Sequence, residues 1–132
     1  MPDLEALAEV FGQYPGVEAV YLFGSQATGQ AHPGSDLDLA VVPADGVPGP
    51  ERLNILADLA RAGFDDVDLI VLDGNDLVLS FEAVRPNQMV YQSAAFDRGA
   101  YYSKVVRMYL DFLPFLEVQR RAYRRRLSHG QT

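Results

Sequence analysis

Two aspartates, Asp36 and Asp38, are separated by one residue at the start of an apolar run, Leu37 to Val42. Successive side chains of a strand point to opposite faces, so both carboxylates would leave the same face if this run is a β-strand. Adjacent carboxylates repel each other and resist burial unless a cation or a proton compensates their charge. A hard cation that prefers oxygen ligands, such as Mg²⁺, is the natural partner. The spacing therefore predicts a metal-binding edge on this strand.

A glycine and a serine, Gly24 and Ser25, follow another apolar run, Val17 to Phe23. A Gly-Ser pair after a strand is suited to open a helical turn, where free backbone amides attract phosphate. Ten residues separate this pair from Asp36. Alone, the pair would indicate an ordinary turn and helix cap, and a lone Asp-x-Asp would indicate a solvated strand end. A phosphate cradle together with metal carboxylates instead predicts chemistry on a nucleoside triphosphate.

A third carboxylate, Asp68, lies inside the apolar run Val67 to Leu72. Apolar neighbours on both sides are unusual for a merely solvated charge. If this run is a strand beside the one that carries Asp36 and Asp38, all three carboxylates can point at one place. Three other aspartates lie nearer the strand ends, and we expect them to be solvated: Asp65, Asp66 and Asp73.

The pattern Gly24-Ser25, ten residues, Asp36-x-Asp38 resembles the signature of the DNA polymerase beta-like nucleotidyltransferases, and the short chain resembles their minimal (MNT) subgroup. The similarity extends into the segment that begins at Asp68 and, more loosely, into residues 109–115. The resemblance implies transfer of AMP from ATP with two Mg²⁺ ions, held by Asp36 and Asp38. It implies that Asp68 ligates one metal and helps to deprotonate the attacking hydroxyl.

The same resemblance assigns roles at the glycine and serine. Gly24 would let the backbone approach the triphosphate, because it has no side chain to obstruct it. Ser25 would bind a terminal phosphate oxygen. Family members often carry a basic residue just after Gly-Ser and another before Asp-x-Asp, where this chain offers Gln26 and His32. Loss of a cation near the phosphates predicts weaker nucleotide binding.

Small MNT proteins typically pair with a HEPN protein, often as antitoxin and toxin. The resemblance therefore implies a hetero-oligomer in which AMP is transferred to a tyrosine of a HEPN ribonuclease toxin and silences it. Two alternatives stay open: a non-catalytic antitoxin that acts by occlusion, and a nucleotidyltransferase that modifies a small-molecule hydroxyl, as on an aminoglycoside. A P-loop NTPase is disfavoured, because no Gly-x-x-x-x-Gly-Lys-Ser/Thr occurs.

Composition narrows the class of protein. The 132 residues are 48% hydrophobic and include no cysteine, which predicts one folded domain over 1–132 without disulfides or zinc-thiolate sites. The net charge of −7 divides into −13 over residues 1–97 and +6 over residues 98–132. Because residues 1–97 are acidic, we expect no direct binding of nucleic acid. No signal peptide or membrane-spanning run is evident, so we expect a cytoplasmic protein with no membrane partner.

The apolar pattern predicts an α/β (α+β) fold: a small mixed β-sheet with helices mainly on one face. The helix after Pro50 is expected to bury a stripe of Leu53, Leu56, Ala57 and Ala60. The C-terminal helical region, about 94–127, must break or kink at Pro114. The other expected elements are an amphipathic helix from Leu4 to Phe11, a short helix from Leu77 to Val84 capped by Asp76, and an edge strand at Met89 to Tyr91.

Overall fold

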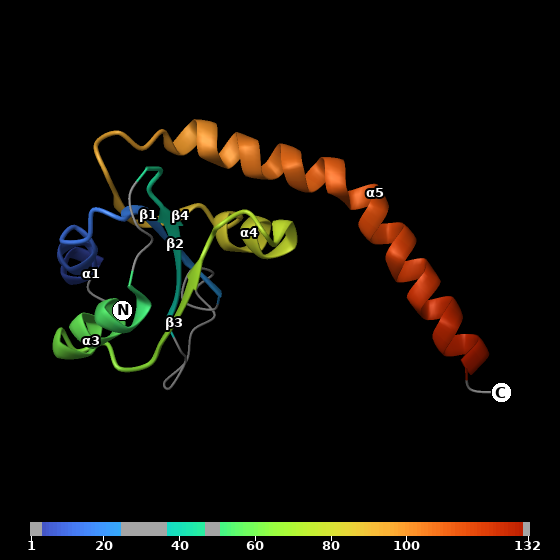
Figure 1. Cartoon of the computed structure of the whole chain (residues 1–132), viewed down its shortest axis with the longest axis horizontal. Coiled ribbons are helices and arrows are strands. Elements are labelled where there is room, and N and C mark those ends of the chain that lie inside the picture. Colours follow the sequence, from blue (N-terminus) through green and yellow to red (C-terminus); the bar gives the residue numbers. More distant parts are fainter. Residues whose placement is uncertain (1–3, 25–36, 47–50, 131–132) are drawn as a thin grey trace.

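The computed structural model describes residues 4–24, 37–46 and 51–130. Four strands form one sheet in the order β3-β2-β1-β4 (Figure 1). Strand β1 is antiparallel to both of its neighbours, whereas β2 and β3 are parallel, so the predicted mixed sheet of the α/β class is confirmed. The elements follow the chain as α1 (Leu4–Phe11), β1 (Val17–Phe23), β2 (Leu37–Pro43), α3 (Arg52–Arg61), β3 (Val67–Val71), α4 (Leu77–Val84), β4 (Gln88–Gln92) and α5 (Arg98–Gly130).

Helices cover both faces of the sheet, so the prediction that they lie mainly on one face is wrong. Helices α1 and α3 pack on one face, where Phe11 and Ile55 join Leu39 in a buried cluster. Helices α4 and α5 pack on the other face, where Ala83 and Val105 join a second cluster. Strands β1 and β2 carry apolar side chains at consecutive positions, and a strand that is apolar on both faces must be covered twice.

The alternation within the strands follows the expected pattern. In β2, Leu39 and Val41 belong to the cluster under α1 and α3, whereas Ala40 and Val42 belong to the cluster under α4 and α5. Asp38 lies two residues before Ala40 and so shares the α4 and α5 face. The strand thus presents its aspartate on the side of the sheet where α4 and α5 lie.

The buried stripe of α3 differs from the prediction. Ile55 and Leu59 are fully buried, whereas Leu53 is 81% exposed. Six of the ten residues from Arg52 to Arg61 are apolar, so more than one helical stripe fits the sequence. Packing against α1 and β3 selects the stripe that contains Ile55.

Helix α5 is continuous through Pro114, which lies inside it. In Figure 1 the helix first runs along the end of the sheet and past α4, then bends and continues away from the body on the side where α4 lies. Phe115 to Leu127 are exposed throughout except for the half-buried Leu116. We call these thirteen residues, 115–127, the arm. Within the described parts of the chain, none of the helices combines the length and apolarity needed to cross a membrane.

Candidate functional site

Asp38 and Asp68 are register partners on the parallel strands β2 and β3. In a parallel pair, residues in register carry their side chains on the same face, so the two carboxylates are neighbours. Asp38 is half-buried, and Asp68 is exposed at the edge of the sheet. The adjacency that the sequence predicted for these two aspartates is therefore present.

Gly24 lies against this pair from the end of β1. Strand β1 pairs with β2 so that Phe23 is opposite Asp38, and Gly24 comes directly after it. Gly24 adopts a positive φ of +71°, a conformation that side-chain-bearing residues rarely adopt. A Cβ placed on Gly24 would lie 3.1 Å from Cγ of Asp38 and would collide with its carboxylate oxygen Oδ2. Glycine is thus required both by the backbone and by the closeness of Asp38.

Ser25 and Asp36, together with Gln26 and His32, lie outside the described residues, and their predicted roles remain predictions. Within residues 4–24, 37–46 and 51–130, no group of three or more histidine, aspartate or glutamate side chains is arranged to hold a metal ion. Two of the three predicted carboxylates are therefore placed side by side, and the third is the residue two positions before Asp38 in the chain.

The described donors fit a hard divalent cation. Carboxylates directly opposite each other on neighbouring strands destabilise a sheet unless a positive charge compensates them. Asp38 and Asp68 have this arrangement, and Gly24, which lies against Asp38, contributes no side chain of its own. Carboxylate oxygens are the donors that Mg²⁺ prefers. Asp38 and Asp68, with Asp36, are the side chains that would hold such an ion.

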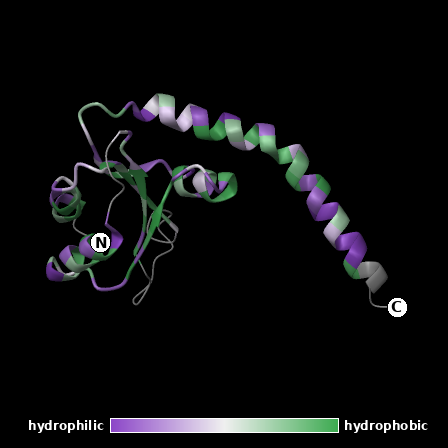
Figure 2. Ribbon diagram, viewed as in Figure 1, coloured by the Kyte–Doolittle hydropathy of each residue, from purple (hydrophilic) through white to green (hydrophobic). Residues whose placement is uncertain are grey.

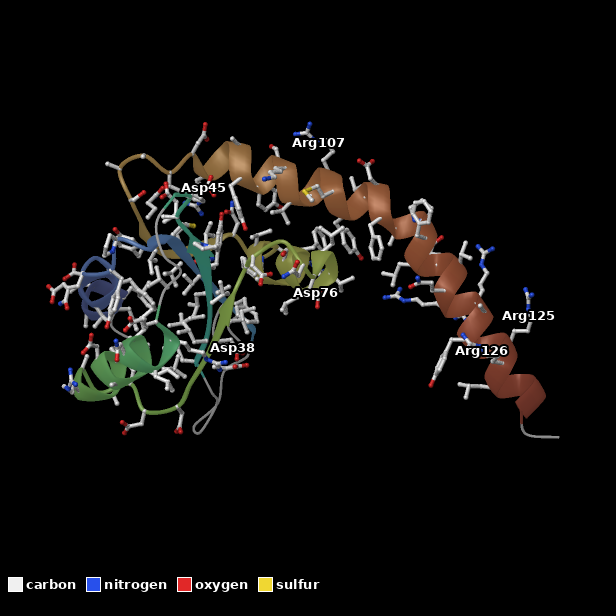
Figure 3. The ribbon with its side chains drawn as sticks, viewed as in Figure 1. Asp38, Asp45, Asp76, Arg107, Arg125 and Arg126 are labelled. Atoms are coloured by element: carbon white, nitrogen blue, oxygen red, sulfur yellow. The ribbon has the colours of Figure 1, made fainter. Side chains whose placement is uncertain are left out.

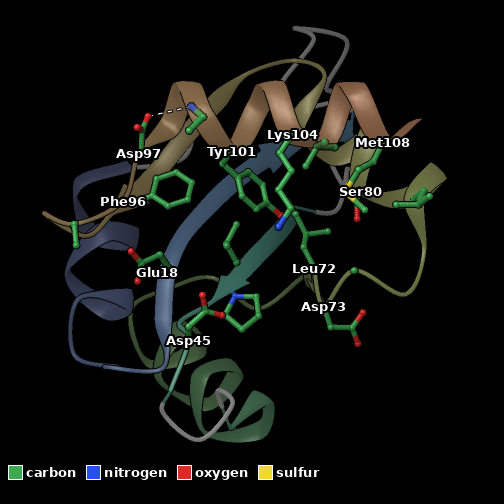
Figure 4. Close-up of a pocket in the computed structure, with 17 residues that line it drawn as sticks. Glu18, Asp45, Leu72, Asp73, Ser80, Phe96, Asp97, Tyr101, Lys104 and Met108 are labelled. Atoms are coloured by element: carbon green, nitrogen blue, oxygen red, sulfur yellow. Dashed lines mark hydrogen bonds between the residues drawn. The ribbon is translucent and has the colours of Figure 1, made fainter. Parts of the chain in front are cut away.

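The described residues also line a cavity away from the paired carboxylates. A pocket of about 560 Å³ opens between α5 and the far end of the sheet, lined in part by Phe96, Tyr101 and Lys104 (Figure 4). Val42 lines it from β2, four residues beyond Asp38, which is about 13 Å along a strand. In Figure 3, Asp38 and Asp45 correspondingly mark opposite ends of β2. The pocket and the paired carboxylates share one face of the sheet but occupy its two ends.

The charged side chains that line this pocket are predominantly acidic. Glu18, Asp45, Asp73 and Asp97 contribute carboxylates, against the single cation of Lys104. Asp97 accepts a hydrogen bond from the backbone amide of Ala100 at 3.0 Å, which caps the start of α5. Such a lining repels a triphosphate, so the pocket does not compete with the Asp38 end of the sheet as a phosphate site. No sequence pattern could have revealed it, because its residues come from several separate segments.

Tyr21 contributes a buried hydroxyl under α5. It is opposite Ala40 in β1–β2 pairing, its side chain is fully buried, and its hydroxyl has no hydrogen-bond partner among the described residues. Its ring stacks with that of Tyr101 at a centroid distance of 6.1 Å. Burial, with a smaller contribution from Tyr101, raises the pKa of Tyr21 to about 12, so the phenol is neutral at physiological pH. Sequence reasoning missed this residue, since its neighbours in space are distant in the chain.

Comparisons with known proteins agree with this geometry. The family model described as polymerase beta nucleotidyltransferase matches residues 5–95. The chain is 33% identical over 95 residues to the protein adenylyltransferase MntA of Shewanella oneidensis, a match that covers 72% of this chain and 68% of the relative. The part of this chain that the family model matches includes Gly24, Asp38 and Asp68.

Solved structures extend the similarity to α5. A crystal structure of a toxin–antitoxin with AMP-PNP contains a chain that matches with a TM-score of 0.71 and 27% identity, over 96% of this chain and 99% of that one. A solved complex of a tri-AMPylated HEPN toxin of Shewanella oneidensis with its MNT antitoxin also matches this chain. The TM-score is 0.64 and the identity is 25%, over 95% of each chain. The arrangement of Gly24, Asp38 and Asp68 and these matches lead to one conclusion: this chain is an enzyme of the polymerase beta-like nucleotidyltransferase family, in the minimal (MNT) branch that MntA represents.

Proposed function

We propose that this chain is an antitoxin that transfers AMP from ATP to a hydroxyl of a HEPN-domain toxin and so neutralises it. The observation that carries the proposal is the in-register pairing of Asp38 with Asp68, beside a glycine whose side chain is excluded. The relatives support the reaction: one is a protein adenylyltransferase, and another was solved in complex with an AMPylated HEPN toxin. A tyrosine hydroxyl is the acceptor that we infer from the family resemblance.

The proposed reaction divides the work among a few side chains. The acceptor oxygen attacks the α-phosphorus of ATP, the bond from that phosphorus to the oxygen that bridges to the β-phosphate breaks, and pyrophosphate leaves. Asp68, exposed at the sheet edge, takes the proton of the acceptor hydroxyl. Gly24 leaves room for the triphosphate beside Asp38, and Ser25 binds a terminal phosphate oxygen through its amide and hydroxyl.

Magnesium belongs to the same proposal. Asp36, Asp38 and Asp68 would hold two Mg²⁺ ions, which supply positive charge for the phosphate oxygens when they are bound. The support from the described residues is the chemistry of the donors and the in-register placement of Asp38 and Asp68 on one face of the sheet. We also propose that residues 1–132 act as a single minimal domain whose C-terminal helical region is α5, and that the protein works in the cytoplasm, where ATP is available.

The test is the intact mass of a HEPN-domain protein encoded with this chain, after incubation with the full-length chain, ATP and Mg²⁺. We expect one or more additions of AMP with the wild type and none with Asp38→Asn. Asp65→Asn is the matched control, because Asp65 is an exposed aspartate near the start of the same strand as Asp68. It should transfer AMP as well as the wild type.

The other outcomes separate the remaining functions. If the toxin is unmodified but is inactive in a stable complex, the chain is an antitoxin that acts by occlusion and not by AMP transfer. AMP on an aminoglycoside in the absence of any protein acceptor would identify a small-molecule nucleotidyltransferase. Full activity of Asp38→Asn would exclude the paired carboxylates as the catalytic centre.

A further inference from the structure

The arm of α5, residues 115–127, projects from the body without covering any part of it. Figure 1 shows the arm continuing beyond α4, and Figure 2 shows hydrophobic and hydrophilic residues alternating along it. Phe115 is 67% exposed and Tyr123 is 59% exposed, although both are large apolar or amphipathic side chains. Exposed side chains of this size, at regular positions on an isolated helix, indicate a surface that packs against another molecule.

One side of the arm continues the side of α5 that packs on the body. Tyr102, Tyr109, Leu116 and Tyr123 recur every seven residues, the spacing of a helix that packs lengthwise against another helix. The first two are used within the chain: Tyr102 packs against the second buried cluster, and the ring of Tyr109 stacks on that of Phe81 in α4 at 4.0 Å. The last two lie beyond the body. This side of α5 is therefore packed against the body at Tyr102 and Tyr109, half-buried at Leu116 and exposed at Tyr123.

The uncovered side faces inward, toward the space beside the sheet. Arg107 and Arg125 project from the outer side of α5 in Figure 3. At about 100° per residue, Leu116, Tyr123 and Leu127 lie on the opposite side of the helix from Arg107. We call Leu116, Tyr123 and Leu127 the inner stripe. The arm leaves the body on the α4 side, which is also the face that carries Asp38, and in Figure 3 it runs back in the direction from Asp45 to Asp38.

The charge of the arm restricts its partner. Its thirteen residues contain one glutamate and five arginines, and within the described parts of the chain none of these arginines makes an ion pair. Two arms would therefore repel each other if they paired side by side. A nucleic acid would meet the charge of −13 on residues 1–97 and would leave the inner stripe unburied. A helix with an apolar side and flanking carboxylates satisfies both the stripe and the arginines.

We propose that the arm is the docking site for the acceptor protein: the inner stripe packs on a helix of the HEPN-domain toxin, whose carboxylates bind the arginines beside the stripe. The inference rests on the proposed function for the identity of the partner. A protein held by the inner side of the arm lies next to the face of the sheet that carries Asp38. The arm then raises the local concentration of the acceptor hydroxyl at the carboxylates without taking part in the chemistry.

The test compares the two sides of the arm in the full-length chain. The inner-side variant is Leu116→Asp with Tyr123→Asp, and the outer-side control is Val118→Asp, since Val118 is 62% exposed and lies on the opposite side of the helix. A second pair tests charge: Arg120→Glu with Arg124→Glu on the flank of the stripe. Its control is the same change in net charge on the outer side, at Arg121 and Arg125. Binding to the HEPN-domain protein encoded with this chain is measured by titration calorimetry, and circular dichroism checks that each variant is folded.

We expect each inner-side variant to weaken binding by about thirtyfold or more, and each outer-side control by less than threefold. In the AMP-transfer assay, the inner-side variants should raise KM for the toxin and leave kcat close to the wild-type value, because Asp38 and Asp68 are untouched. Asp38→Asn should bind like the wild type. If binding depends on the inner stripe but no AMP is transferred, the docking site stands and the proposed reaction fails.

Three results would overturn the docking site. The first is equal binding by inner-side and outer-side variants. The second is a concentration-dependent dimer of this chain, seen by sedimentation velocity, that the inner-side variant abolishes. The third is binding of a single-stranded RNA oligonucleotide that is lost with Arg120→Glu and Arg124→Glu while toxin binding persists.

Discussion

Gly24 and Asp38 approach so closely that the glycine has no room for a side chain: a Cβ at position 24 would lie 3.1 Å from Cγ of Asp38 and 3.4 Å from its Cβ. The two residues come from the end of β1 and the start of β2, which the sheet brings into register through Phe23. The glycine of the Gly-Ser pair thus provides the space that the second aspartate of Asp-x-Asp occupies. These two residues of the motif, separated by thirteen residues in the chain, are therefore neighbours in space.

Gly24→Ala should slow AMP transfer strongly and destabilise the protein. The matched control is Gly46→Ala, because Gly46 also has a positive φ, +78°, but nothing lies within 4 Å of the position of its Cβ. We expect Gly46→Ala to lower the free energy of unfolding by about 1 kcal/mol for the backbone conformation alone, with normal transfer. Gly24→Ala should cost more than that in urea unfolding and reduce the transfer rate by about a hundredfold or more. Equal rates for the two variants would show that the contact with Asp38 does not matter for catalysis.

Magnesium should stabilise the protein through the paired carboxylates. Thermal melting of the wild type with and without about 10 mM MgCl₂ should show a rise of about 3 °C, as expected for a ligand that binds only the folded state. Asp68→Asn should lose this rise.

Without a divalent cation, in the presence of a chelator, the repulsion between the two carboxylates should lower the melting temperature of the wild type. Asp68→Asn should then melt at a higher temperature than the wild type, because it removes a like charge that is opposite Asp38 in the sheet. A rise with Mg²⁺ that persists in Asp68→Asn would place the ion elsewhere. Ca²⁺ and Mn²⁺ in parallel samples test whether the site selects among divalent ions.

Tyr21→Phe should stabilise the protein at neutral pH and flatten its alkaline unfolding. The buried hydroxyl has no partner among the described residues, so its removal should raise the free energy of unfolding by about 1 kcal/mol. The folded-state pKa of about 12 lies above the ordinary value of 10. The folded state therefore holds the proton more tightly, and this contribution is complete below pH 10 and is lost as the pH rises through 12.

Tyr14→Phe is the contrasting variant. Burial and a hydrogen bond to Asp58 raise the pKa of Tyr14 to about 12 as well, so this variant should also flatten the alkaline limb. Unlike Tyr21→Phe, it should destabilise the protein at pH 7, because Asp58 loses the hydrogen bond from Tyr14 and keeps the one from Arg61. Urea unfolding between pH 7 and pH 11.5 measures both effects. Identical effects at pH 7 would contradict the assignment of Tyr21 as the unpartnered hydroxyl.

The stack of Phe81 on Tyr109 should couple α4 to α5 energetically. The two rings are 4.0 Å apart and inclined by 5°. In a double-mutant cycle with Phe81→Leu and Tyr109→Leu, we expect a coupling of about 1 kcal/mol in the free energy of unfolding. Leu110→Ala should be close to neutral, since Leu110 is 57% exposed on the same helix. A coupling near zero would mean that α5 is held to the body by its first turns alone.

The strand-level features of the site were accessible from the sequence, because a strand alternates its side chains strictly. Alternation placed Asp38 and Asp68 on one face of their strands, and the parallel register of β2 and β3 then joined them. The sequence also contains the information that both faces of the sheet are covered. Strands β1 and β2 are apolar at nearly every position, which is typical of strands buried on both faces.

The helices were less predictable, for two physical reasons. In α3 the apolar residues cover most of the circumference, so local periodicity could not choose Ile55 over Leu53, and only contact with α1 and β3 does so. In α5, Pro114 removes one hydrogen bond of the helix, that to the carbonyl of Leu110. Leu110 is exposed, so water can satisfy that carbonyl, and the helix bends there without ending. The sequence contains a seven-residue spacing of Tyr102, Tyr109, Leu116 and Tyr123, but only the structure shows that the first two pack against the body.

The separation of the arm from the sheet has a consequence for how such enzymes diversify. The carboxylates lie within residues 36–68, and the arm occupies residues 115–127. No residue serves both, so a change in one imposes no compensating change in the other. Substitutions along the arm can follow a coevolving target, or redirect the modification to a new one, while the chemistry is inherited intact. A chimaera that carries the C-terminal segment of a distant homologue would inherit that homologue's choice of target.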